Sequence, residues 1–578
     1  MKNKISIIFF VLAAMFIATS CTDLDETFYD QLTPDQFQPD DTAPVGIVYS
    51  ILRGSPVVPY TYPGSEFVWF IQTSTDEVCV PIKTGGDWKD DYVFQEMQKH
   101  TWTGNNKVVL SAWNYCFDII GACNVELSKP RYSLNQQAQI RLVRAYAYMM
   151  AMDMFGNVPV VIENHQGAVP QNSTRKQVFD FVESELNDLI MDNLRFRRTS
   201  EVWGKSILYT LRARLYLNSN VYLGGNTPLA DSDDSYKANL AKVIANADSV
   251  TAMNRFAVTD YFKSFYVDND LAENSSDIIC ALEYKPTEGT IGNFLQLLGL
   301  ARGVQYALGI PVLASVVNGP VVNPGKTADD EEALYNLFDA NDIRRLSMIA
   351  KQLKYVYEFD ANGQPYEITD KPYYMSDLRW GGGVVGDLLT CNPFFTGGFS
   401  PWNGVPDNPN AANRGDGARM MKYEMVTNQA WEMANNLVLM RYTEVLYMKA
   451  EALIRLNRGG EATSIFNEVL AKRGYDGSDF RADSLASKRF LENQYEMLNI
   501  PVTPTLDFME KEWRREFVFE NRRRSDMIRF DKFLGTWGLK AEVSQPYKRI
   551  FPIPTDILNR NPNMKQNPGY DGYDGWLD

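Results

Sequence analysis

Several aromatic residues of this chain lie in polar or glycine-rich stretches, where a ring is better placed to contact a ligand than to fill a core. The 578 residues include 31 Tyr, 31 Phe and 11 Trp, which together make 13% of the chain. Aromatic faces stack on flat ligands such as sugar rings, and nearby amides or carboxylates hydrogen-bond the hydroxyl groups. The excess of loop aromatics therefore indicates ligand binding.

Trp88 is the strongest of these candidates. It follows Gly85, Gly86 and Asp87 in an evident loop, and a short polar run then leads to Tyr92. Trp102 and Tyr284, in contrast, are expected to pack in the core. The residues that we expect to contact a ligand are Asp87, Trp88, Tyr92, Phe294, Tyr306, Trp380 and Trp402.

Residues suited to catalysis or metal binding are poorly represented. The chain has two histidines, His100 and His165, so a histidine-rich metal site or a Ser-His-Asp triad is hard to assemble. Its 72 carboxylates make a pair at glycosidase separation expected by chance. The acidic clusters at 231–234 and 268–270 offer oxygen ligands for calcium, but they lack the glycine and terminal glutamate of an EF-hand, and solvated loops are the favoured interpretation. We therefore expect no catalytic residue, no metal and no cofactor.

Cys21 ends a segment with the layout of a bacterial secretion signal. Lys2 and Lys4 precede an apolar run over 5–18, and small residues lead directly to Cys21. The run is shorter than the roughly 20 residues of a spanning helix. A cysteine at this point is typical of a lipoprotein, which is cleaved before the cysteine and acylated on its sulfur; an ordinary signal with a chance cysteine is the alternative. We expect a signal peptide over 1–20, a lipid anchor at Cys21 and an acidic tether over 21–40.

The net charge limits the possible partners. The formal charge is −15, and loss of Lys2 and Lys4 with the signal leaves −17. An acidic surface repels phosphate backbones and anionic lipid headgroups, so nucleic acid is not expected as a partner. The membrane is expected to be reached through the lipid on Cys21.

Cysteine spacing argues against a disulfide scaffold. Five cysteines remain after Cys21, and an odd number leaves at least one outside any internal pair. Cys116 and Cys123 lie seven residues apart in an expected helix, which separates their Cα atoms by about 10 Å and excludes a bond between them. A hydrophobic core must therefore stabilise the fold.

The elements that would position these residues are mostly helical up to about residue 255. The segment 136–155 has apolar residues at intervals of three and four and stops at Gly156, and 174–193 and 203–222 repeat the pattern. Helices resume at 435: 437–473 reads as a helix-turn-helix of tetratricopeptide length, and 506–530 as a charged last helix.

The middle of the chain, 255–434, is different. Gly, Pro and Asn are frequent, 278–284 reads as a strand, and 355–359 with 364–368 read as a hairpin. The stretch 380–418 is expected to be a long loop, and such loops often carry function. The pattern predicts a helical part over 41–254, a loop-rich insertion over 255–434 that forms the ligand face, and a second helical part over 435–578.

Four groups of residues, in order along the chain, resemble one family. They are TDEV at 75–78 with GDW at 86–88 and HTW at 100–102; RAYAY at 144–148 with DMFGNVP at 153–159; WRREFVFENRR at 513–523; and FPIP at 551–554 with NP at 561–562 and QNPGY at 566–570. Together they resemble the SusD-like (RagB/SusD) outer-membrane lipoproteins. In the third group, Asn521 stands where the family pattern commonly has Gly.

The resemblance implies a mainly α fold, a tetratricopeptide-like helical scaffold with a loop-rich mixed α/β insertion. It implies a lipid-anchored protein on the outer face of the outer membrane of a Bacteroidetes bacterium. The implied task is non-catalytic: capture of an oligo- or polysaccharide and its delivery to a SusC-like TonB-dependent transporter, with the protein acting as a lid over that transporter.

Two other functions remain open. Some relatives resemble peptide-uptake components, so a surface lipoprotein that captures peptides or glycoproteins is one alternative. An exported glycoside hydrolase is the other. For the charged and aromatic residues in the family segments, such as Arg144, Tyr148, Arg514, Arg515, Glu516, Glu520 and Arg522, we expect structural ion pairs and packing rather than ligand contact.

Overall fold

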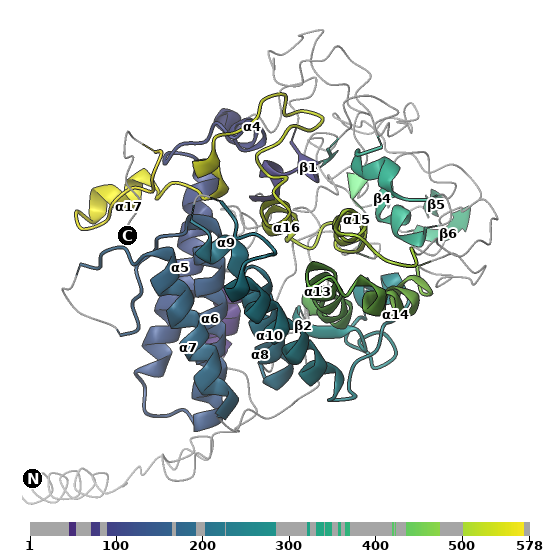
Figure 1. The fold of residues 1–578 in the computed structure, drawn as a ribbon, viewed down its shortest axis with the longest axis horizontal. Helices are drawn as coiled ribbons and strands as arrows, with labels where there is room; N and C mark the ends of the chain where they lie inside the picture. Colours follow the sequence, from purple (N-terminus) through teal and green to yellow (C-terminus); the bar gives the residue numbers. More distant parts are fainter. Residues whose placement is uncertain are drawn as a thin grey trace, which may run out of the picture. The chain divides into compact units, whose positions relative to one another are not determined.

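A computed structural model describes most of the helical parts of the chain and short pieces of the middle (Figure 1). The described residues are 46–53, 71–80, 90–163, 169–191, 203–225, 227–266, 268–284, 321–323, 331–339, 342–349, 356–359, 365–369, 419–420, 422–423, 435–473 and 501–570. They all belong to the compact unit formed by Thr42–Asp578. The expected signal, Cys21 and tether lie outside the described residues.

Helices dominate the described residues. Those before the middle of the chain are α2 Gly46–Arg53, α4 Val93–Lys99, α5 Lys107–Leu127, α6 Leu134–Phe155, α7 Arg175–Met191, α8 Lys205–Leu217, α9 Ser219–Leu223 and α10 Asp234–Thr251. Those after it are α13 Tyr442–Arg455, α14 Gly459–Leu470, α15 Leu506–Glu516, α16 Arg523–Arg529 and α17 Thr555–Arg560.

Local sequence signals set the ends of the long helices. Ser133 caps α6, and its hydroxyl accepts from the backbone N–H of Gln136 while the Gln136 side chain accepts from the backbone N–H of Ser133. Gly156 ends α6 with φ at 65°, a left-handed conformation that glycine adopts without a Cβ penalty. The start expected near 174 is also correct, because the Thr174 hydroxyl accepts from the backbone N–H of Gln177.

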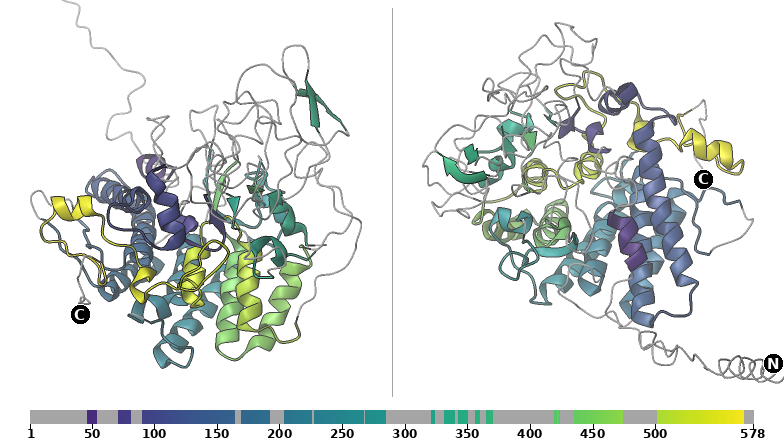
Figure 2. Two further views of the ribbon diagram at one scale, coloured as in Figure 1. Left: turned by 90° about the horizontal axis from the view of Figure 1, so that it is seen from above. Right: turned by 180° about the vertical axis from the view of Figure 1, so that it is seen from behind.

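The helices pack in series. The long helices α5 and α6 run side by side (Figure 2), α7 packs on α6, and α8 on α7. The array continues through α10, α13 and α14, and α15 packs on α13. Because α10 and α13 touch although they are far apart in the sequence, the chain leaves the helical array after α10 and returns to it at α13.

Among the described residues, four pairs of short antiparallel strands accompany the helices. The pairs are β1 Val78–Cys79 with β3 Val321–Val322, β2 Ile278–Leu282 with β8 Leu437–Arg441, β4 Met348–Ile349 with β7 Arg419–Met420, and β5 Val356–Phe359 with β6 Pro365–Thr369. The strand expected near 278 and the hairpin expected at 355–368 are thus confirmed. The β2–β8 pair brings together the start and the end of the segment that connects α10 to α13.

Three expected helices have different bounds in the structure. Residues 437–441 form β8 rather than the start of a helix, because their backbone pairs with β2, and the helix-turn-helix starts at Tyr442. The helix expected at 203–222 is broken at Asn218 into α8 and α9. The charged helix expected at 506–530 is two helices, since Phe519 and Asn521 between them have φ values of 62° and 56°.

A continuous apolar core fills the space between these helices. Cys116 and Cys123 are both buried in α5, as expected, without a disulfide. Among the described helices, α5 alone has the length and composition of a membrane-crossing helix. More than half of its apolar window is buried in the protein, as in the core helix of a folded domain.

Candidate functional site

Tyr92 is the one predicted ligand residue that the described part of the chain contains. It ends the short 3₁₀ helix Asp90–Tyr92 and is the N-cap of α4, with 37% of its surface exposed. Asp91 and Tyr92 both have left-handed backbones, with φ at 55° and 66°. This conformation costs a residue with a Cβ roughly 1–2 kcal/mol, and such strain concentrates at functional sites. The backbone therefore holds the Tyr92 ring at the surface at an energetic cost.

The other predicted ligand residues are not placed. Asp87, Trp88, Phe294, Tyr306, Trp380 and Trp402 lie outside the described residues. Trp102 and Tyr284, which we expected in the core, are buried, with 1% and 5% of their surfaces exposed. The Trp102 indole N–H donates to the Tyr570 hydroxyl over 2.8 Å, which explains how a buried tryptophan satisfies its polar atom.

The segment that leads toward the Asp87–Tyr92 stretch is anchored by a buried carboxylate. Asp76 accepts two hydrogen bonds from Arg523, from Nε over 2.7 Å and from Nη2 over 2.8 Å, and Arg514 lies 3.3 Å away. Burial raises the pKa of Asp76, but the two guanidinium groups outweigh it and lower the pKa to about 2. Asp76 is therefore ionised at neutral pH and fixes this segment to the C-terminal part of the chain.

Glu77, the next residue, behaves in the opposite way. Burial raises its pKa to about 8, and the backbone N–H of Phe519, Arg523 and Lys422 only partly offset that effect. Its side chain is 2% exposed. Glu77 thus holds a proton at neutral pH, whereas Asp76, which is also buried, is ionised because Arg523 and Arg514 contact its carboxylate directly.

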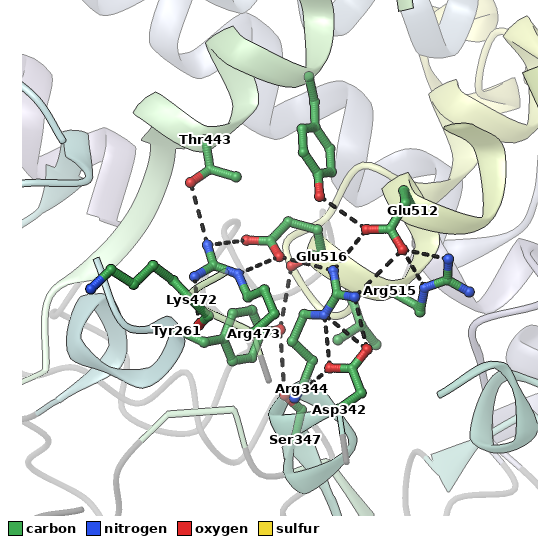
Figure 3. Close-up of polar contacts among 12 residues, drawn as sticks. Tyr261, Asp342, Arg344, Ser347, Thr443, Lys472, Arg473, Glu512, Arg515 and Glu516 are labelled. Carbon is green, nitrogen blue, oxygen red and sulfur yellow. Dashed lines mark hydrogen bonds and ion pairs between the residues drawn. The ribbon is translucent and has the colours of Figure 1, made fainter. Parts of the chain in front are cut away.

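A network of buried charges surrounds the C-terminal end of α15 (Figure 3). Both oxygens of Glu516 accept from Arg473, from Nε over 2.8 Å and from Nη2 over 2.9 Å. Arg441 at the end of β8 and Arg344 donate to the same carboxylate over 2.9 and 3.2 Å. Burial raises the pKa of Glu516, but these arginines hold it well below its ordinary value. We call Asp342, Arg344, Arg441, Arg473, Glu512 and Glu516 the Glu516 network.

Arg344 connects the middle of the chain to this network. Its guanidinium group binds Asp342 through Nε and Nη2, and its Nη1 donates to Glu512 over 3.0 Å. The Tyr447 hydroxyl donates to the same Glu512 oxygen over 3.0 Å. Residues from the insertion, from α13 and from α15 therefore converge on two carboxylates (Figure 3).

The backbone between α15 and α16 explains an unusual residue. Asn521 has φ at 56°, in the left-handed region that glycine and asparagine tolerate best. Its side-chain oxygen also accepts from Gln72 Nε2 over 2.9 Å. Asparagine can therefore replace the glycine that is common at this position and adds a hydrogen bond to the N-terminal segment.

The structural role expected for the charged motif residues is confirmed, but most of their partners are distant. Arg522 pairs with Asp526 four residues on, over 2.8 Å. Arg144 instead reaches Glu185 over 2.9 Å, and Glu520 binds Arg441. Sequence reasoning missed Arg344, Arg441 and Arg473, since no local spacing links them to Glu516.

The described acidic residues offer no clear metal centre. No group of three or more His, Cys, Asp or Glu with the geometry to hold a metal occurs among the residues that the structure places. Asp233 caps α10 and Asp231 pairs with Arg455 over 2.7 Å, so both have structural tasks. Asp268 accepts from Asn274 over 2.9 Å.

Comparison with known proteins gives a consistent match. The model of the SusD family matches residues 230–570. The chain is 27% identical to the starch-binding protein SusD of Bacteroides thetaiotaomicron over 475 residues, which cover 76% of this chain and 73% of that protein.

Solved structures share the fold. A SusD superfamily protein from Parabacteroides distasonis superimposes with a TM-score of 0.59 at 15% identity and covers 87% of this chain and 93% of its own. Surface glycan-binding protein A from Bacteroides uniformis gives 0.57 at 16% identity, with coverage of 90% and 99%. These neighbours confirm the expected mainly α, tetratricopeptide-like architecture.

Proposed function

The chain belongs to the SusD family, and from this premise we propose that it is a surface lipoprotein that binds an oligo- or polysaccharide without cleaving it and delivers it to a SusC-like TonB-dependent transporter. The observation that carries the glycan part is the similarity to a starch-binding protein over 73% of that protein's length. The name of the Bacteroides uniformis neighbour, a surface glycan-binding protein, points the same way.

The backbone around Tyr92 supports a binding surface at the Asp87–Tyr92 stretch. Two successive left-handed residues with side chains, Asp91 and Tyr92, are unfavourable for stability alone. They hold a partly exposed ring at Tyr92, which follows two further predicted ligand residues, Asp87 and Trp88, in the sequence. An aromatic ring beside carboxylates is the composition that recognises a sugar.

Two carboxyl groups that precede this stretch in the sequence favour binding over catalysis. Asp76 is held by two arginines, and Glu77 is buried and protonated. Glycoside hydrolysis requires a carboxylic acid that reaches the substrate and a second carboxylate near it. Neither Asp76 nor Glu77 is exposed in a way that would allow this role. We propose that the protein releases its ligand unchanged.

The binding surface is tested by affinity electrophoresis of the mature chain, with Cys21 changed to Ser, against a broad polysaccharide panel. We expect retardation by at least one polysaccharide. Trp88→Ala and Tyr92→Ala should weaken the retardation at least fivefold, whereas Leu134→Ala, at an 84% exposed position on α6, should leave it unchanged. A Trp88→Ala protein that is retarded as strongly as the parent would contradict the assignment of the surface.

The two competing functions give different results in parallel assays. Binding of oligopeptides without binding of any glycan favours peptide capture. Release of reducing sugar by the purified protein favours a glycoside hydrolase. We expect glycan binding with no release.

The anchor and the partner need separate tests. Labelling with a palmitate analogue should be lost in Cys21→Ser, and surface protease treatment of whole cells should remove the protein. Affinity purification of the tagged, lipidated chain should recover a TonB-dependent transporter. Labelling that places the protein only in the periplasm would contradict delivery from the cell surface.

A further inference from the structure

A groove separate from the Asp87–Tyr92 stretch is lined by α5, by α7 and by two short segments, 160–163 and 170–173, which we call the arms. The arms are joined at their base, where the backbone N–H of Ser173 donates to the Val158 carbonyl over 3.1 Å. No backbone hydrogen bond joins 160–162 to 170–172 in the part of the chain that the structure describes. The groove has a volume of about 800 Å³, which falls within the range of roughly 300–1,000 Å³ that is typical of ligand sites.

The α5 wall of the groove contains a glycine that the fold does not require. Gly121 is an interior residue of α5, where glycine costs about 0.5–1 kcal/mol relative to alanine. A Cβ at this position would meet no atom within 4 Å apart from its own helix backbone, so packing does not call for glycine. Its backbone is not left-handed either. Glycine at this position leaves the backbone of α5 open to the groove and allows another chain segment to approach it closely.

Exposed apolar side chains gather around the groove. Val125 on α5 and Ile162 line it with 40% and 47% of their surfaces exposed, and Val169, next to a lining residue, is 48% exposed. Glu163 is the one charged residue among the described lining residues, although 22% of the chain is charged. Apolar residues that are grouped in this way, rather than scattered singly, are typical of an interaction surface.

The first arm also offers an open backbone edge. Val161 is fixed by the helices beneath it, since its carbonyl accepts from Asn124 Nδ2 and from the Tyr148 hydroxyl, each over 2.8 Å. The N–H groups of Val160 and Ile162 have no acceptor among the described residues. An extended segment can add to such an edge as a further strand, with its backbone providing hydrogen bonds and its side chains entering the groove.

The second arm is bound to the last described part of the chain. The side chains of Asn561 and Asn563 donate to the carbonyls of residues 170 and 169 over 2.8 and 3.0 Å. The backbone N–H of Lys565 donates to Asn172 Oδ1 over 2.7 Å, and Asn172 lines the groove. The chain therefore runs along the rim of the groove shortly before residue 570.

The residues that follow can reach the groove. Tyr570 comes five residues after Lys565, so their Cα atoms are at most about 18 Å apart. The segment 571–578 spans up to about 26–29 Å when it is extended. Because Lys565 is at the rim, this segment is long enough to return to the groove and enter it.

The sequence of 571–578, DGYDGWLD, fits the chemistry of the groove. Tyr573, Trp576 and Leu577 supply apolar side chains for the exposed valines and isoleucine. The two glycines permit close approach to the α5 backbone at Gly121. The aspartates need to stay outside an uncharged groove, and Lys565, which is exposed, offers them a cation at the rim.

We propose that residues 571–578 dock in this groove as an extended strand beside 160–163, with Trp576 as the main apolar anchor. The interaction needs little intrinsic affinity, because a short connection gives the segment an effective concentration in the millimolar range. The docked segment closes the gap between the arms and covers the apolar patch. This inference is independent of the proposed glycan-binding function.

The first test observes the segment in the full mature chain, with tryptophan replaced by 5-fluorotryptophan. The ¹⁹F resonance of Trp576 is assigned by its loss in Trp576→Phe. Gly121→Leu places a side chain in the open space of the groove and should shift this resonance toward that of the free peptide. Gly460→Leu is the matched control, because it also adds a side chain to a helical glycine with open space around it, but on α14. A Trp576 resonance that is the same in Gly121→Leu and in the parent overturns the proposal.

The second test asks whether the segment blocks the groove. A full-length variant with Tyr573, Trp576 and Leu577 changed to Ser should leave the groove vacant. It should bind a fluorescein-labelled peptide with the sequence of 571–578 saturably and at least tenfold more tightly than the parent does. Adding Gly121→Leu to this variant should weaken the binding at least tenfold, whereas adding Gly460→Leu should not change it. Equal anisotropy curves for the parent and the serine variant overturn the assignment of 571–578 to the groove. Retardation by polysaccharide is measured separately, so either failure leaves the proposed function standing.

Discussion

The Glu516 network and the surface around Tyr92 both contain features that cost folding free energy, but the two features serve different purposes. In the network, charges are taken out of water, and the carboxylates of Glu512 and Glu516 are matched by arginines from distant elements. At Tyr92, an aromatic ring stays partly in water on a left-handed backbone. The first arrangement is satisfied within the protein, whereas we propose that the second serves to bind a ligand. The most conspicuous charged motif of the chain is therefore structural, and the proposed binding surface rests on the weaker aromatic pattern.

The largest effect is expected from breaking the network. Glu516→Gln removes the charged partner of Arg473 and one of the three carboxylates that Arg441 binds, and removal of one member of a buried ion pair costs roughly 3–5 kcal/mol. Chemical denaturation should show this loss in the free energy of unfolding. Asp507→Asn on the same helix is the control, because its carboxylate is 67% exposed and should change stability by less than about 1 kcal/mol. Similar losses in both variants would contradict the structural role of the network.

The second effect is that the free energy of unfolding depends on pH through Glu77. Its pKa is about 8 in the folded protein and near the ordinary value of 4.5 in the unfolded chain, so between these two pH values the folded state holds a proton that the unfolded state has released. The contribution of Glu77 to stability is therefore fully present below about pH 4.5 and is lost as pH rises through 8. At about 1.4 kcal/mol per unit, the change amounts to a few kcal/mol.

Glu77→Gln isolates this effect, because glutamine keeps the shape and cannot ionise. The variant should unfold at a higher denaturant concentration than the parent at pH 8.5 and show a smaller difference at pH 5. Glu461→Gln, at an exposed position on α14, should follow the parent at both values. An unchanged pH profile in Glu77→Gln would show that Glu77 is ionised in the folded protein.

A smaller effect concerns the turn between α15 and α16. Asn521→Ala keeps a Cβ at a left-handed position but removes the side-chain amide. It should lower the free energy of unfolding by about 1–2 kcal/mol. Asn521→Gly should cost less, because glycine adopts this backbone freely and loses only the bond from Gln72. Thermal unfolding of the two variants side by side checks the order, and a more stable alanine variant would contradict it.

The smallest change in stability is expected at the binding surface. Tyr92→Gly relieves the left-handed strain and removes an exposed ring, so its free energy of unfolding should stay within about 1 kcal/mol of the parent. Its glycan binding should nevertheless fall. Thermal unfolding together with affinity electrophoresis separates the two properties, and parallel losses would mean that Tyr92 is structural.

Sequence patterns captured the parts of the fold that depend on local signals. The end of α6 follows from Gly156, and the β5–β6 hairpin from its turn residues. The break at Asn218, the strand at 437–441 and the split between α15 and α16 were missed, because tertiary pairing and left-handed residues override helical periodicity there.

The candidate site was predictable only in part. Aromatic residues in polar loops identify Tyr92 as partly exposed, and the burial of Trp102 and Tyr284 was also expected. The ion pairs of Glu516 join residues 43, 75 and 172 positions apart, and no sequence spacing reveals them.

The most direct test of glycan capture is affinity electrophoresis of the mature chain and its Trp88→Ala variant on a broad polysaccharide panel. The account predicts that at least one polysaccharide retards the parent, that the variant is retarded at least fivefold less, and that both proteins unfold at the same temperature. A parent protein that no polysaccharide retards, while oligopeptides bind it, would contradict the account.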